Sequence, residues 1–155
     1  MNPAVIAIDF DGTITKSGCG KLLVFRPGGK EAICDLYRLG FELILWTCRY
    51  GKCLEEAITF LKENGILHCF KGINTNSEQI SENYDPRKIV ADIYIDDRNV
   101  GGLMSWHEIL KKIKTEYCPS VVSKSEYLQD GIISEELFEN RLRGLLEEAG
   151  YIIGE

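Results

Sequence analysis

Short runs of apolar residues alternate along the chain with stretches in which apolar residues recur every three or four positions. The runs are AVIAI (4–8), FELILW (41–46), ILHCFKGI (66–73) and ADIYI (91–95). Runs of this length are typical of strands that are buried on both faces of a parallel sheet. We therefore predict strands at 4–8, 41–46 and 91–95, and a further short strand within 66–73.

The segments between these runs have the periodicity of amphipathic helices. Their apolar stripes are Ala32, Ile33, Leu36 and Tyr37; Leu54, Ala57, Ile58 and Leu61; and Trp106, Ile109, Leu110, Ile113 and Tyr117. Gly40 and Gly65 follow the first two stripes, and glycine commonly ends a helix at this position. The alternation of strands and helices predicts an α/β fold, with a doubly wound, Rossmann-like parallel sheet flanked by helices.

The last part of the chain differs from the rest in charge. Residues 1–114 carry 15 acidic and 15 basic side chains, whereas residues 115–155 carry 9 acidic and 3 basic and so hold the whole net charge of −6. We predict a catalytic domain at 1–115 and an acidic C-terminal extension at 116–155, with an amphipathic helix after Ser134. This extra helix is expected to pack on the same domain. The alternative is that it joins copies of the chain into a homo-oligomer.

Composition argues against several classes of function. No apolar run approaches the ~20 residues that span a membrane, and no strongly basic surface indicates nucleic-acid binding. The N-terminus lacks the basic and long apolar parts of an export signal, so we expect a cytoplasmic protein. The six cysteines form no C-x-x-C pair and only two histidines are present, so no zinc site is expected. We interpret the cysteines as reduced and mostly as small core residues.

Polar residues that can carry chemistry stand at the ends of the predicted strands. They are Asp9 and Asp11 after the first strand, Thr47 after the second, Lys88 just before the third, and Asp96 and Asp97 at its end. Ligands of parallel sheets bind at the carboxyl ends of the strands. Carboxylates this close together repel one another unless a cation lies among them, and oxygen ligands without cysteine or histidine suit Mg²⁺. Taken singly, each feature also fits a solvated turn, a strand end or a helix cap.

Four phrases of the sequence resemble the motifs of the haloacid dehalogenase (HAD) superfamily of phosphotransferases. They are DFDGTIT (9–15), LILWTCR (43–49), DPRKIV (85–90) and IYIDDRN (93–99), in the order of that family and within residues 4 to about 110. The sequence is similar to small, stand-alone bacterial HAD hydrolases. This resemblance implies a HAD-like fold and a Mg²⁺-dependent phosphomonoester hydrolase.

The resemblance also implies a role for each motif residue. Asp9 matches the nucleophile that forms an aspartyl-phosphate, and Asp11 matches the general acid and base. Thr47 and Lys88 match the pair that holds the phosphate. The metal ligands would be the Asp9 carboxylate, the main-chain oxygen of Asp11 and one acid of the final motif. For that acid we favour Asp97, with Asp96 as its support, although the two are interchangeable on sequence alone.

Other residues within these motifs are candidates for binding the substrate, a phosphorylated compound of unknown class. They are Gly12, Thr13, Cys48, Arg49 and Arg98, of which the arginines can grip oxyanions with two hydrogen bonds. Few residues separate Asp11 from Pro27, which leaves room for a small hairpin flap but not for a cap domain. We therefore expect an open site.

Two other classes of function remain open. Receiver domains also combine an acidic cluster, a threonine and a lysine, so the site could accept a phosphoryl group without turnover; the order of the motifs argues against this. A binding module could instead retain the acidic site and engage a partner through its acidic tail. The resemblance and the order of the motifs favour the hydrolase.

Overall fold

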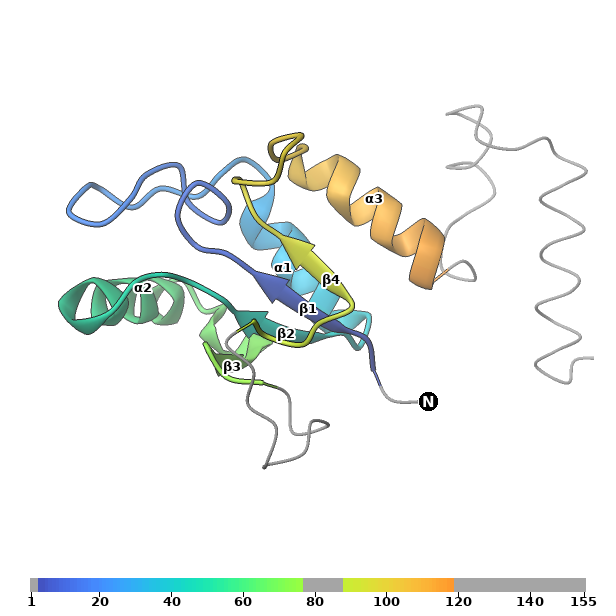
Figure 1. Ribbon diagram of the computed structural model, residues 1–155, viewed down its shortest axis with the longest axis horizontal. Helices are drawn as coiled ribbons and strands as arrows, with labels where there is room; N and C mark the ends of the chain where they lie inside the picture. The colour runs from blue at the N-terminus through green and yellow to red at the C-terminus, as the bar shows by residue number, and fades with distance from the viewer. Residues whose placement is uncertain (1–2, 77–87, 119–155) are drawn as a thin grey trace, which may run out of the picture. The chain divides into compact units, whose positions relative to one another are not determined.

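The computed structural model describes residues 3–76 and 88–118 (Figure 1). The chain divides into two compact units, Met1–Leu110 and Lys111–Glu155. Of the second unit, only residues 111–118 are described. The candidate chemistry therefore has to be read from the first unit, which contains the whole sheet.

A four-stranded parallel sheet forms the centre of the first unit (Figure 1). Its strands are β1 (Val5–Ile8), β2 (Glu42–Leu45), β3 (Phe70–Ile73) and β4 (Ile93–Ile95). Their order across the sheet is β3-β2-β1-β4, and every neighbouring pair is parallel. All four residues of β1 are buried, as the continuous apolar run predicted for a strand covered on both faces.

Three α-helices accompany the sheet. They are α1 (Gly29–Arg38), α2 (Gly51–Glu63) and α3 (Trp106–Tyr117), and a short 3₁₀ turn, η1 (Leu67–Cys69), precedes β3. The buried side chains of α1 include Ala32, Ile33 and Leu36, which belong to its predicted stripe. The boundary between the two units falls within α3, and the buried Trp106 and Ile109 belong to the first unit. No helix in the described ranges is long and apolar enough to cross a membrane.

Hydrogen bonds continue the strand ladders by one residue at the carboxyl edge of the sheet. The Asp9 amide donates to the Ile95 carbonyl at 2.9 Å, so the residue after β1 is held beside the end of β4. On the other side, the Trp46 amide donates to Ile8 and the Asn74 amide donates to Leu45, both at 2.8 Å. This edge therefore places the residues that follow β1, β2 and β3 side by side, with the first of them beside the end of β4.

The predicted α/β fold, its four strands and its three helices are confirmed. The division at residue 115 stays a prediction. The helix predicted after Ser134, with its packing or its role in a homo-oligomer, lies outside the described residues.

The interpretation of all six cysteines as reduced is wrong for two of them. Cys19 and Cys53, which are 34 positions apart in sequence, form a disulfide with their Cα atoms 5.7 Å apart. A hairpin between β1 and α1 brings Cys19 to the start of α2, which no local spacing in the sequence indicates. Only Cys69 among the four free cysteines is fully buried, and Cys48 is exposed.

Candidate active site

Three carboxylates meet at the carboxyl edge of the sheet. Asp9 follows β1, and Asp96 and Asp97 follow β4. Each offers an oxygen that lies within 4.8 Å of the others, a separation at which the three could hold one metal ion. Because β1 and β4 are neighbours, the pairing of the strands is what brings together acids that are almost 90 positions apart in sequence.

Thr13 fixes the spacing between two of these acids. Its hydroxyl donates to Oδ2 of Asp9 at 3.0 Å and accepts the backbone N–H of Asp97 at 2.9 Å. The Thr13 side chain is fully buried, and its carbonyl accepts a hydrogen bond from the Trp106 indole at 3.0 Å. Gly29 leaves room for that indole, since a Cβ there would lie 2.9 Å from its Nε1. Thr13 was predicted to bind substrate, but its contacts are those of a residue that orients the acids.

Gly12 allows the loop after β1 to pass close to Asp97. Its φ of +83° lies in the left-handed region that favours glycine, and a Cβ at this position would overlap the Asp97 carboxylate. The Gly12 carbonyl accepts a hydrogen bond from Nη1 of Arg26 at 2.7 Å. Gly12 was also predicted to bind substrate, and here it serves the packing of the acidic cluster.

Burial is the main cause that raises the pKa of the Asp9 carboxyl to about 6. The negative charges of Asp96 and Asp97 act in the same direction, whereas hydrogen bonds from the Phe10 backbone and from Thr13 act against it. Among the described residues, no positive charge compensates the ionised form of Asp9. A bound cation would supply that charge.

Asp97 has an oxygen that the described residues leave without a partner. Its Oδ1 is buried and accepts no hydrogen bond, a costly state for a carboxylate unless a ligand meets it. Asp96 differs, because its Oδ1 accepts the Arg98 backbone N–H at 2.7 Å. This difference agrees with Asp97 as the direct metal ligand and Asp96 as its support, and that assignment stays a prediction.

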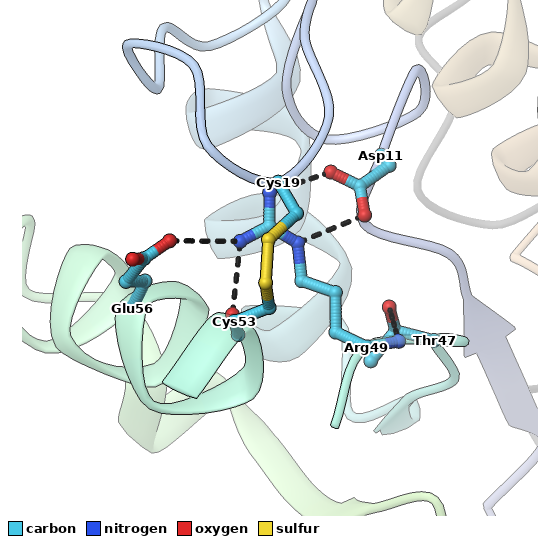
Figure 2. The surroundings of a disulfide bond; sticks show 6 residues. All are labelled: Asp11, Cys19, Thr47, Arg49, Cys53 and Glu56. Carbon is cyan, nitrogen blue, oxygen red and sulfur yellow. Dashed lines mark hydrogen bonds and ion pairs between the residues drawn. A yellow bond between two sulfur atoms is a disulfide. The ribbon is translucent and has the colours of Figure 1, made fainter. Parts of the chain in front are cut away.

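Asp11 is paired with Arg49. Nε of Arg49 donates to Oδ2 of Asp11 at 2.8 Å and Nη2 donates to Oδ1 at 2.7 Å, so the contact is bidentate (Figure 2). The Arg49 side chain is only 2% exposed, and its guanidinium also lies 4.7 Å from the centre of the Phe10 ring. Arg49 was predicted to grip the substrate. Its side chain is buried and bound to Asp11, so its contact here is with that carboxylate, and a contact with the substrate stays a prediction.

Thr47 is held at the end of β2 by a residue that the sequence did not single out. The Asn74 side chain accepts the Thr47 backbone N–H and donates to the Thr47 carbonyl, both at 2.8 Å. Asn74 has a φ of +52°, a conformation that asparagine adopts more easily than most residues. An asparagine directly after an apolar strand was the only signal for it. The Thr47 hydroxyl accepts the Arg49 backbone N–H at 3.2 Å.

The remaining predicted residues lie outside these networks. Lys88 is exposed, and its ammonium lies over the Tyr94 ring, 4.7 Å from the ring centre. Within the described ranges no hydrogen bond or ion pair joins Lys88 to the three acids. Cys48 and Arg98 are exposed, as expected of residues that could meet a substrate.

The comparison with solved structures gives an informative match. No family model matches the chain, and no curated protein matches it. The solved structure of a conserved protein coded by a locus of Bacteroides thetaiotaomicron is 34% identical, with a TM-score of 0.67, and the match covers 79% of this chain and 100% of the other. The chain belongs to the same family as that protein. A shared fold assigns no activity by itself, so the activity has to be argued from the site.

Proposed function

We propose that the protein is a Mg²⁺-dependent phosphomonoester hydrolase of the HAD type, with a doubly wound core and no cap domain. The observation that carries the proposal is the cluster of Asp9, Asp96 and Asp97, with the partnerless Oδ1 of Asp97 within it. The strand order β3-β2-β1-β4, in which the chain crosses to the other side of β1 for its last strand, is consistent with such a core.

The donor set suits a hard divalent cation. It consists of carboxylate oxygens, which Mg²⁺ prefers, and the Asp9 and Asp97 carboxylates would hold the ion with the main-chain oxygen of Asp11, supported by Asp96. When bound, the ion would neutralise charge on the phosphoryl group. The raised pKa of Asp9 and the partnerless oxygen of Asp97 are the two features of this chain that such an ion would relieve.

In the proposed reaction, Asp9 is the nucleophile and Asp11 transfers the protons. In the first step a carboxylate oxygen of Asp9 attacks phosphorus and the bond from phosphorus to the ester oxygen breaks. The leaving alcohol takes its proton from the protonated form of Asp11, in which one carboxyl oxygen carries the proton and has given up its hydrogen bond from Arg49. In the second step Asp11 takes a proton from water. The oxygen of that water attacks phosphorus, which releases inorganic phosphate and restores the Asp9 carboxylate.

Three further residues support these steps. Arg49 orients the Asp11 carboxylate through two hydrogen bonds, and Asn74 fixes the backbone of Thr47. We propose that the Thr47 hydroxyl donates a hydrogen bond to a phosphoryl oxygen. Lys88 would have to leave the face of Tyr94 to reach the same group.

A panel of phosphomonoesters tests this function. Sugar phosphates, nucleotides, phosphopeptides and nucleic acids with terminal phosphates should be assayed for phosphate release with Mg²⁺ and with a chelator. We expect release from at least one class, lost on chelation and restored by Mg²⁺. Phosphate release at the same rate with and without the chelator would contradict the metal-dependent mechanism. A stable phosphoprotein without release would favour the phospho-acceptor alternative.

Binding of Mg²⁺ should depend on pH in a direction set by Asp9. The folded-state pKa of about 6 lies above the ordinary value of 3.8, so folding favours the protonated form. Without metal, the free energy of unfolding should therefore fall as the pH rises from about 4 to about 6. Because Mg²⁺ needs the ionised carboxylate, it should raise the melting temperature by several degrees near about pH 8 and by much less near about pH 5.

Thermal unfolding with and without Mg²⁺ at both pH values measures this effect without any substrate. Asp9→Asn should remove the stabilisation by Mg²⁺ at the higher pH. Asp35→Asn, a change of the same chemistry on helix α1, should leave it intact, because Asp35 pairs only with the exposed Arg38. Equal stabilisation of wild-type protein and Asp9→Asn would argue against Asp9 as a ligand.

A further inference from the structure

The disulfide lies next to the proposed general acid and base. Cys19 is exposed and Cys53, in the first turn of α2, is partly exposed, so both sulfur atoms can be approached from solvent. Exposed disulfides exchange with thiols more readily than buried ones, and those that exchange readily are commonly regulatory or catalytic.

Cys19 belongs to a hairpin that we call the flap, residues 14–26. At its base, the Lys16 amide donates to the Val24 carbonyl and the Arg26 amide donates to Ile14, each at 2.9 Å. Towards its tip, residues 20–23 face α2 across a hollow of about 710 Å³, whose other wall includes Lys52, Glu56 and Phe60. The disulfide is the covalent tie between this tip and α2.

Cys53, the disulfide cysteine on α2, also contacts Arg49. The Cys53 carbonyl accepts a hydrogen bond from Nη1 of Arg49 at 2.9 Å (Figure 2). The other nitrogens of the same guanidinium, Nε and Nη2, bind the two oxygens of Asp11. A continuous chain of bonds therefore runs from the flap tip through Cys53 and Arg49 to Asp11.

We propose that Cys19 and Cys53 form a redox-modification site that controls how firmly Arg49 holds Asp11. The co-substrate is a dithiol: its thiolate attacks one sulfur, the Cys19–Cys53 bond breaks, and the second thiol resolves the mixed disulfide. Two electrons and two protons pass to the protein, which gains two thiols, while the dithiol becomes a disulfide. A disulfide reagent reverses the exchange. Reduction frees the flap tip and loosens the first turn of α2, so Arg49 orients Asp11 less well.

The first test follows the flap and needs no substrate. Alkylation and mass spectrometry should count two fewer free thiols in the oxidised protein than after treatment with dithiothreitol. Trypsin should cut after Lys16 and Lys21 on the order of tenfold faster in the reduced protein. Cys19→Ser and Cys53→Ser should be cut fast in both conditions, whereas Cys34→Ser, which changes a cysteine outside the disulfide, should respond as wild type does. Equal thiol counts, or equal cutting rates, would overturn the proposal.

The second test follows the contact with Asp11. The Arg49 Nε–H signal, identified by its loss in Arg49→Lys, should exchange with solvent on the order of tenfold faster after reduction. An unchanged exchange rate would refute the coupling even if the flap is released.

The effect on turnover rests on the proposed function. We expect kcat to fall several-fold on reduction in wild-type protein and to be equal in both states in Cys19→Ser. Equal kcat in both states of an active wild-type enzyme would refute control of the reaction. Absence of any phosphatase activity would instead count against the proposed function, and the trypsin and exchange measurements would still decide the redox site.

Discussion

Replacement of Asp9 by asparagine should abolish phosphoester turnover. The amide cannot attack phosphorus, and removing the nucleophile of a covalent mechanism leaves only the residual effects of binding and orientation, so we expect a fall in kcat of at least about 10⁴-fold. The fold should persist. Asparagine has nearly the same shape, its side-chain oxygen can still accept from Thr13, and it removes a buried charge that costs free energy.

The measurement is kcat with the best substrate of the panel, together with the melting temperature. Asp35→Asn is the matched control and should keep both values, because its carboxylate lies on α1 and pairs only with Arg38. Incubation with labelled substrate should label wild-type protein transiently and Asp9→Asn not at all. Near-normal Mg²⁺-dependent turnover by Asp9→Asn would remove the nucleophile from the mechanism and with it the HAD assignment.

Replacement of Asp11 by asparagine should slow turnover by roughly 10² to 10⁴-fold, the usual contribution of general acid and base catalysis. The loss should depend on the leaving group. Esters of acidic phenols need little protonation of the leaving oxygen, so their first step should be slowed far less than that of alkyl esters. Single-turnover rates for the two kinds of ester measure this difference.

The neighbourhood of Arg49 offers a matched control for Asp11. Glu56 also faces this guanidinium, at 3.9 Å, but its side chain is 55% exposed and such pairs contribute little. Glu56→Gln should therefore change kcat by no more than about twofold. If Asp11→Asn slowed phenyl and alkyl esters equally, the role of Asp11 would be that of a structural partner of Arg49 and not that of an acid.

The sequence predicted most reliably the positions of residues that directly follow strands. The apolar runs located β1, β2 and β4, and the rule that ligands bind at the carboxyl ends of parallel strands then predicted that Asp9, Asp96 and Asp97 would meet. This inference is robust because the sheet fixes the positions of the backbone. A residue one position beyond a paired strand has little freedom to lie elsewhere.

The choice of side-chain partner was not predictable in the same way. Arg49 was expected to face the substrate, yet its buried guanidinium lies over Phe10 and pairs with the partly exposed carboxylate of Asp11, so the two opposite charges satisfy one another. Asn74 and the pair Cys19 and Cys53 depend on the paths of loops, which apolar periodicity does not encode. Such contacts are decided by three-dimensional proximity between segments far apart in sequence.

The close packing around Thr13 limits which substitutions this protein family can accept. A Cβ at Gly12 would overlap the Asp97 carboxylate, and a Cβ at Gly29 would lie too close to the indole that holds Thr13. Variation at these two glycines would therefore disturb the three acids before it altered the exposed surface around them. New substrate preferences should therefore arise on outward-facing positions such as Tyr50 and Arg98, whose side chains are free to change without moving the acids.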